Sequence, residues 1–538
     1  MPSICIVFLF AIPYLLLTAV HAFDRSNVPL KNWGGFAVNH SWIYDALEKV
    51  VLAGLTDEVI LNTKPLSRVE AARIVAQAVR RLQEDQYGDY NHRGYLEDLL
   101  YQLVAEFGPE LAEMGVRTPL NRETASMFFT LKPVEHAQLD SLFAGRSEGI
   151  VNNFGRSAAK GGNAVGSLEG RAQIGDFLSL YYQPEFSLDR DGYQGRFLSV
   201  YGKLTYWNTE LLAGRESLWW GPGFRGSMTF SNNAFPLDQL RLSSAEPFHL
   251  PWLFRYLGPV KASLFLAQLE ENRELPHAKV GGWRVEFAPS RYVEIGFNRI
   301  FQFGGRGRPT LKPWQFLQLL LDQGSDDPDS SLNVNNVMSL DLTLRFPDVR
   351  RYIFVARDLS LYGELGWDDT QDPGFRFLFL PTGAIIPRKP GALVGVLLTG
   401  FLGDPKLDLR VEYAKTTDIQ FSHSRYTSGF TNRGFLLSHF IGTDGSEIFA
   451  RTSRWISPNL LLGFQLSRAE IGSPIPALLG APREKRDSFG FDLSYRISDR
   501  SSVFLEYDFV RIKDRGFVPG KSGNNNVFRF EYTRSFGR

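Results

Sequence analysis

Two adjacent tryptophans, Trp219 and Trp220, lie in the segment GRESLWWGPGFRGSMTFSNNA, which runs from position 214 to 234. Indole rings offer a flat apolar face on which the C–H faces of a sugar can pack, while charged and amide side chains can bind its polar groups. Arginine in particular pairs well with carboxylates. The segment therefore predicts a saccharide-binding surface made by Arg215, Glu216, Trp219, Trp220, Arg225, Asn232 and Asn233. In the alternative interpretation, both rings anchor the rim of a membrane protein at the lipid interface, and the glycines only turn the chain.

The N-terminus determines the compartment. It carries the apolar run ICIVFLFAIPYLLLTAV, with small residues at Val20 and Ala22, which predicts a secretory signal over residues 1–22 that is cleaved after Ala22. A retained anchor helix is the alternative, although the run is short for a bilayer and Pro13 interrupts it. Cleavage also removes Cys5, the single cysteine, so the exported chain would have neither disulfides nor cysteine metal sites.

The composition excludes some classes of protein. The chain carries 59 Lys and Arg against 58 Asp and Glu, which excludes the strongly basic surface of a nucleic-acid-binding protein. Its 14% aromatic content and 50 glycines are typical of a β-rich chain. No stretch after the signal is long and apolar enough for a transmembrane helix, so only a β-barrel would allow this chain to cross a membrane.

Residues 23–150 are predicted to form a small periplasmic helical region. Between about 40 and 115, apolar residues recur with helical spacing, as in Ile43, Ala46, Leu47 and Val50. The sequence Ser67-Arg68-Val69-Glu70 has the form of a capping box that opens a helix.

Residues 151–538 are predicted to form a large antiparallel β-barrel. From about residue 165 the apolar period changes to two, as in Leu178, Leu180 and Tyr182. Alternation alone also fits a soluble sandwich. The polar faces of these strands, however, carry opposed charges that suit a wet lumen, among them Arg410, Glu412, Asp492, Arg496, Glu506 and Asp508. At roughly 10 residues per strand plus connections, the region holds about 18 transmembrane strands.

The last strand, VFRFEYTRSFGR, alternates aromatic and polar residues up to Phe536. It resembles the C-terminal signal by which outer-membrane proteins are recognised for insertion, although Gly537 and Arg538 follow the final aromatic residue. The predicted location is therefore the outer membrane of a diderm bacterium.

The stretch LLAGRESLWWGPGFRGSMTFSNNAFPLDQLRL and the later segment FRYLGPVKASLFLAQLEENRELPHAKVGGWRVEFAPSRYVEIGFNRIFQFGGRGRP resemble the capsule-assembly Wzi family. The resemblance implies a barrel of about 18 strands with a periplasmic helical bundle. It also implies a lectin-like, non-enzymatic role in which the barrel binds and retains capsular or related surface polysaccharide. Outer-membrane lipid and the polysaccharide export machinery are the other expected partners, and no cofactor, metal site or nucleic acid is expected.

Two other functions remain open from the sequence. A passive diffusion porin would use the same barrel, and an outer-membrane hydrolase could use His249, which has serines and Glu246 nearby in the sequence. No histidine lies in a recognised catalytic motif. The long segment 304–331, with a short apolar helix at its centre, is predicted either to cover the lumen or to pack on the rim.

Overall fold

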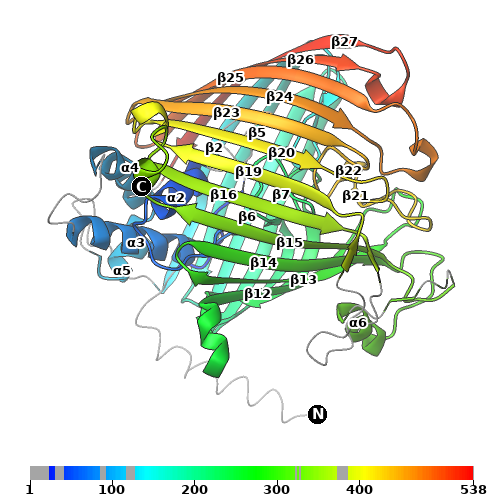
Figure 1. Ribbon diagram of the computed structural model, residues 1–538, viewed down its shortest axis with the longest axis horizontal. Helices are drawn as coiled ribbons and strands as arrows, with labels where there is room; N and C mark the ends of the chain where they lie inside the picture. Colours follow the sequence, from blue (N-terminus) through cyan, green and yellow to red (C-terminus); the bar gives the residue numbers. More distant parts are fainter. Residues whose placement is uncertain are drawn as a thin grey trace.

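The computed structural model describes residues 24–30, 42–84, 93–116, 128–321, 324–325, 327, 329–371 and 386–536. The predicted signal, residues 1–22, lies outside these residues. Figure 1 shows a cluster of helices at one end of a large barrel, whose long strands run from the helices to the opposite end. None of the described helices is long and apolar enough to span a membrane.

The helical region consists of α2 (Trp42–Leu52), α3 (Arg68–Glu84), α4 (Arg93–Glu106) and α5 (Gly108–Glu113). Their apolar faces share one core that includes the fully buried Leu47 and Leu103. The predicted capping box at the start of α3 is confirmed. The backbone N–H of Ser67 donates to the Glu70 carboxylate (2.8 Å), and the backbone N–H of Glu70 donates to the Ser67 hydroxyl (3.2 Å).

Eighteen long strands close into one antiparallel barrel, which confirms the predicted fold. They are β2 (Phe129–Ala144), β5 (Gly161–Ile174), β6 (Leu178–Asp189), β7 (Gly192–Tyr206), β8 (Thr209–Glu216), β10 (Leu237–Ser244), β12 (Pro259–Gln268), β13 (Lys279–Ser290), β14 (Val293–Phe303), β15 (Asn335–Phe346), β16 (Asp358–Trp367), β19 (Gly391–Thr399), β20 (Leu407–Lys415), β23 (Ser446–Ser457), β24 (Leu460–Ile471), β25 (Glu484–Ser498), β26 (Ser501–Lys513) and β27 (Gly523–Ser535).

The short strand β1 (Thr63–Lys64) lies between α2 and α3. Other short elements lie in the connections of the barrel. The strands among them are β3 (Glu148–Gly149), β4 (Ser157–Ala158), β9 (Trp219–Trp220), β11 (Phe248–His249), β17 (Asp369–Gln371), β18 (Ile386–Arg388), β21 (Thr431–Asn432) and β22 (Phe435–Leu436). The helices among them are α6 (Pro313–Leu320), η1 (Trp252–Leu257), η2 (Val349–Arg351), η3 (Phe401–Gly403), η4 (Pro476–Leu478) and η5 (Arg515–Phe517).

The barrel begins earlier in the chain than the predicted boundary between 23–150 and 151–538. Strand β2 belongs to it, because β2 pairs with β27 from His136 to Ala144 and so closes the ring. On its other side β2 pairs with β5, with a register shift between Lys132 and His136. A bulge of this kind interrupts the period of two and hides the strand from a search for alternation. The predicted boundary at residue 151 is therefore corrected to a point before Phe129.

The two ends of the barrel differ in their connections. At the end that holds the helices, most strands are joined by short turns, including 207–208, 291–292, 458–459 and 499–500, and the connections 245–258 and 347–357 are longer. At the opposite end the connections include the long loops 217–236, 304–334 and 416–445 (Figure 1). Transmembrane barrels have short turns on the periplasmic side and longer loops outside. The helices therefore lie at the periplasmic end, and the long loops are extracellular.

Ion pairs hold the helical region in the periplasmic mouth of the barrel. Lys49 of α2 pairs with Asp408 of β20 (2.6 Å), and Glu70 of α3 pairs with Lys261 of β12 (2.5 Å). These barrel partners are buried on the inner face of the wall. The helices therefore contact two separate parts of the ring from the inside, six strands apart.

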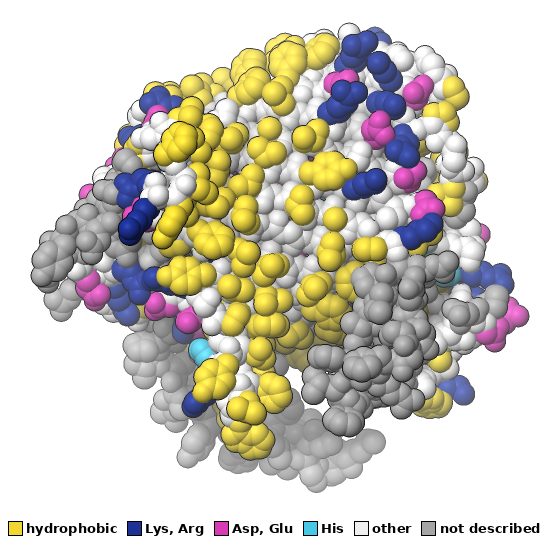
Figure 2. Space-filling view, in the orientation of Figure 1, with side chains coloured by type: hydrophobic (Ala, Val, Ile, Leu, Met, Phe, Trp, Pro, Cys, Tyr) yellow, Lys and Arg dark blue, Asp and Glu magenta, His cyan; other side chains and the backbone are white. Residues whose placement is uncertain are grey.

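The outer face of the wall is apolar (Figure 2), whereas the inner face is polar and charged. In β26, Leu505 points outward and the next residue, Glu506, is buried inside. Inward charges pair across strands, as Arg284 of β13 does with Asp341 of β15 at 2.7 Å. The strand between them places Gly296 under this pair, where a Cβ would collide with both charged groups. The opposed charges that the sequence predicted for the lumen thus form ion pairs on the inner face of the wall.

Replacing Leu505 by arginine should destabilise the folded barrel by about 2–4 kcal/mol, because the charge would lie in the lipid-facing band near mid-strand. Leu505 is 43% exposed and points outward. Heat-modifiable mobility in detergent gels measures the loss of folded protein. Asn524→Arg is the matched control, since Asn524 is exposed at the extracellular end of β27 and a charge near the interface costs little. A Leu505→Arg variant that folds as well as the control would contradict lipid contact at this position.

Candidate functional site

The loop 217–236 leaves β8 at the extracellular end and folds back into the lumen. Its strand β9 pairs with β1 of the N-terminal region, with Trp220 opposite Thr63 and Trp219 opposite Lys64. The backbone N–H of Gly221 donates to the carbonyl of Asn62 (2.9 Å). Gly221 has a φ of 131° and lies against Glu364, so a side chain would not fit there. A loop from outside and a segment from the periplasmic end therefore meet inside the barrel.

Both tryptophans of the motif are buried. Trp219 is 0% exposed and belongs to the core of the helical region. Trp220 is 1% exposed and packs edge-on against Phe230 and Phe265, with ring centroids 5.3 and 5.4 Å away. A sugar platform needs an exposed ring face, and a rim anchor must face lipid. The structure corrects both interpretations, because the two rings are internal packing groups that fix the inserted loop.

Arg225 binds carboxylates inside the lumen. The backbone N–H groups of Phe224 and Arg225 donate to the two oxygens of Glu412 (2.7 and 2.9 Å). The Arg225 guanidinium pairs with Glu447 (2.9 Å) and lies 4.9 Å from the centre of the Phe449 ring. Arg225 is 6% exposed, so it stabilises the inserted loop instead of facing a polymer.

Three further predicted residues are also committed to the protein interior. Glu216 accepts a hydrogen bond from Arg241 (2.6 Å) inside the wall. The Asn233 side chain donates to the carbonyl of Leu436 (3.0 Å), and Asn232 is 2% exposed. Six of the seven residues predicted to form a binding surface are therefore buried. They hold the inserted loop inside the lumen.

Arg215 is the exception, because it belongs to a group of arginines around one ring at the extracellular end. The guanidinium carbons of Arg196, Arg215 and Arg433 lie 5.0, 5.0 and 4.0 Å from the centre of the Phe235 ring. These three residues, here called the arginine cluster, come from β7, from β8 and from the turn of the β21–β22 hairpin. That hairpin is tied to the inserted loop by a hydrogen bond from Asn432 to the carbonyl of Phe235 (2.7 Å).

The arginine cluster has unequal charge compensation. Arg196 pairs with Glu185 (3.1 Å), and Arg215 pairs with Asp238 (2.6 Å). Arg433 is exposed, and no carboxylate of the described residues lies within ion-pair distance of it. Partial burial and the positive charge of Arg215 lower the pKa of Arg433 below its ordinary value. A carboxylate from solution would relieve this repulsion, so the arrangement can bind an anion.

Arg196 and Arg433 are not among the residues that the sequence predicted for the site. Phe235 and Asn432, which join the two parts of the cluster, are 197 residues apart in the chain. A local signal existed only in the turn sequence TNRGF, where Arg433 has a φ of 52° and therefore projects from a tight turn. Nothing in that turn indicates which ring it will cover.

The segment 304–334 lies on the outer wall and does not cover the lumen. Its helix α6 places Phe316 against Phe301 (centroids 5.7 Å apart), which points outward from β14. The carbonyl of Leu320 accepts a hydrogen bond from the Trp283 indole (3.0 Å). Of the two predicted alternatives for this segment, the structure supports packing on the rim.

Comparison with known proteins identifies the family. The sequence model of the family described as "capsule assembly protein Wzi" matches residues 143–527, which is most of the chain. The chain belongs to the Wzi family. The matched region contains the motif around Trp219 and Trp220, from which the sequence already predicted this family.

A solved structure and one curated sequence are similar to this Wzi family member. The fold matches Wzi of Escherichia coli, described as an outer-membrane protein involved in group 1 capsule assembly and a carbohydrate-binding β-barrel, with a TM-score of 0.68. The match has 18% identity and covers 93% of this chain and 99% of that one. An uncharacterised 55.8 kDa protein from the cps region of Klebsiella pneumoniae is 35% identical over 111 residues, which is 20% of this chain and 22% of that protein. The chain is an outer-membrane β-barrel of this family.

The filled lumen does not support the alternative function as a diffusion porin. Cavities beside the inserted segments are small: one lined by Asp45, Lys64 and Phe224 has a volume of about 30 Å³. Porins of this strand number leave an aqueous channel. The hydrolase alternative gains no support either, because Glu246 is held by Arg25 (3.1 Å) and Arg73 (2.8 Å).

Proposed function

We propose that this Wzi family member binds an acidic surface polysaccharide at the extracellular mouth of the barrel and retains it at the cell surface during capsule assembly. Membership of the capsule-assembly Wzi family and the carbohydrate binding described for Escherichia coli Wzi support a polysaccharide ligand. The arginine cluster supports an acidic one, since it presents the exposed guanidinium of Arg433 beside two further arginines.

The filled lumen supports retention at the surface rather than passage. The inserted loop and the N-terminal segment are hydrogen-bonded to each other within the barrel, so the described residues obstruct the path that a polymer chain would take through it. The arginine cluster, in contrast, lies beyond the inserted loop at the extracellular end. A uronic-acid carboxylate bound there could form paired hydrogen bonds to a guanidinium.

Replacing Arg433 by glutamate should weaken binding of a purified uronic-acid polysaccharide by at least tenfold. Hydrogen bonds to charged groups contribute about 1.5–3 kcal/mol each, and 1.4 kcal/mol is a factor of ten. Surface plasmon resonance with the detergent-solubilised protein measures the affinity, with a neutral glucan as the comparison polymer. Cells that carry the variant should still produce and export the polymer but shed more of it into the medium.

Arg306→Glu is the control for charge alone, because Arg306 is 70% exposed on another extracellular loop. It should retain the parent affinity. If Arg433→Glu is well folded and binds the acidic polymer as tightly as Arg306→Glu does, the arginine cluster is not the binding site.

A further inference from the structure

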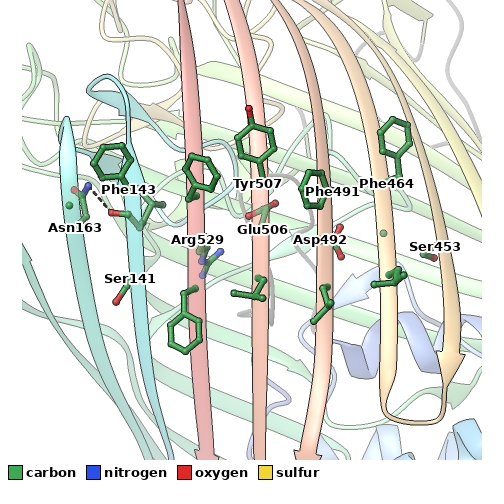
Figure 3. Close-up of a pocket in the computed structure, with 18 of the residues that line it drawn as sticks. Ser141, Phe143, Asn163, Ser453, Phe464, Phe491, Asp492, Glu506, Tyr507 and Arg529 are labelled. Carbon is green, nitrogen blue, oxygen red and sulfur yellow. Dashed lines mark hydrogen bonds between the residues drawn. The ribbon is translucent and has the colours of Figure 1, made fainter.

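The outer wall opposite α6 carries an apolar groove that the polysaccharide proposal does not use. Its volume is about 1440 Å³, and it is centred on the adjacent strands β24, β25, β26, β27 and β2 (Figure 3). Residues of the flanking strands β5, β6, β20 and β23 complete its lining. Aromatic rings stand in a row along it, and Phe143, Phe491 and Phe528 are each more than half exposed to the surroundings. The groove is continuous with the lipid-facing surface, so its occupant in the membrane is an acyl chain.

A patch of basic side chains lies on the same outer wall at the extracellular end (Figure 2). We define this basic patch by four outward-facing residues of β24, β25 and β26, namely Arg468, Lys485, Arg511 and Lys513. The acidic residues at outward positions of these strand ends are Glu470 and Asp487. Glu470 pairs with Lys485 (3.3 Å), and Asp487 pairs with Arg468 (3.6 Å).

The basic patch has four cationic side chains, and only two of them pair with carboxylates in the part of the outer wall that the structure describes. Among the described residues, no carboxylate lies within ion-pair distance of Arg511 or Lys513, and both side chains are exposed. In the register of β25 with β26, Asp487 lies opposite Arg511, whereas Lys485 lies opposite Lys513. Like charges placed opposite each other destabilise a sheet. A multivalent anion bound between them would remove this repulsion.

The spacing between the groove and the basic patch matches half a bilayer. Along β25, Phe491 in the groove lies six positions after Lys485 in the patch, which is about 20 Å of strand at ~3.3 Å per residue. For a strand tilted by roughly 40°, this corresponds to about 15 Å along the membrane normal. The hydrocarbon core is about 30 Å thick, so the patch lies at the level of the outer lipid headgroups when the groove lies at mid-membrane.

We infer that the outer wall of β24–β27 is a binding site for a phosphorylated, multiply acylated saccharolipid of the outer leaflet. Its phosphates would contact Lys485, Arg511 and Lys513, and its acyl chains would lie along the aromatic groove below. An acidic polysaccharide matches the charge of the patch but has no acyl chains for the groove directly beneath. The combination of the two features therefore favours the lipid.

The test uses the full-length protein in detergent and two probes: purified bis-phosphorylated lipid A, and the same lipid after removal of its phosphates. We expect the parent to bind the phosphorylated form at least tenfold more tightly, as measured by native mass spectrometry at graded lipid concentrations. In the variant Lys485→Ala/Arg511→Ala/Lys513→Ala this preference should disappear. In Phe491→Ala/Phe528→Ala, binding of both probes should weaken, because the acyl chains lose their contacts.

Arg433→Ala and Arg306→Ala serve as controls, because they remove extracellular arginines that lie away from β24–β27 and should leave lipid binding unchanged. Since the patch side chains are exposed, the triple variant should fold like the parent. If its folding is impaired, Arg511→Gln and Lys513→Gln provide the same comparison singly. Equal binding of the two probes by the parent would overturn the inference. So would a folded triple variant that keeps the phosphate preference, or one that loses only its binding of an acidic polysaccharide.

Discussion

The double variant Trp219→Ala/Trp220→Ala is expected to conduct ions across a planar bilayer, whereas the parent protein should be nearly closed. Trp219 anchors the inserted loop in the core of the helical region, and Trp220 anchors it against Phe230 and Phe265. Removing a buried aromatic side chain costs about 3–5 kcal/mol per site. That loss should release β9 from β1, and the released loop would uncover a lumen as wide as that of a porin.

Trp252→Ala is the matched control for this experiment. Trp252 is 86% exposed in η1 at the periplasmic end, so its removal should change neither conductance nor stability. A well-folded double variant whose conductance equals that of the Trp252 control would show that the two buried tryptophans do not keep the lumen closed.

Replacing Arg225 by alanine should destabilise the folded protein by about 3–5 kcal/mol, because it leaves the buried carboxylate of Glu447 without its cation. The midpoint of unfolding in guanidinium chloride, followed by tryptophan fluorescence in detergent, measures the effect.

The variant Arg225→Ala/Glu447→Gln separates loss of charge pairing from loss of packing. With the unpaired charge removed, most of the stability should return, since a neutral amide costs less to bury than a carboxylate. If this double variant is as unstable as Arg225→Ala alone, the contribution of Arg225 comes from its packing on Phe449 and not from its ion pair.

The barrel could be predicted because each lipid-facing strand repeats the same constraint. An outward residue such as Leu505 must be apolar and an inward one such as Glu506 must be polar, so the period of two is visible in the sequence. The capping box at Ser67 was visible for a similar reason, because its partners are three residues apart. Strand β2 could not be found in this way, because its bulge near His136 shifts the pattern midway.

The candidate site was much harder to predict, because burial of a loop is a tertiary property. The motif around Trp219 has the composition of an exposed loop, with glycines, serines and asparagines, and its fold into the lumen depends on partners such as Asn62 and Glu412 far away in the chain. The arginine cluster depends in the same way on the hairpin that carries Arg433. The residue types predicted a saccharide-binding surface, but their local spacing did not indicate that six of the seven residues would be buried.

The pairing of β1 with β9 also constrains the order in which the chain can fold. β1 comes from the part of the chain that is synthesised before all eighteen barrel strands, yet it ends up inside the ring that β2 and β27 close. Its neighbour Asn62 contacts Asp341, a residue 279 positions later. Contacts of such long range form slowly and need their partners held in place. Because the ring closes around β1, we expect a defect in these few helices to appear first as a failure of membrane insertion.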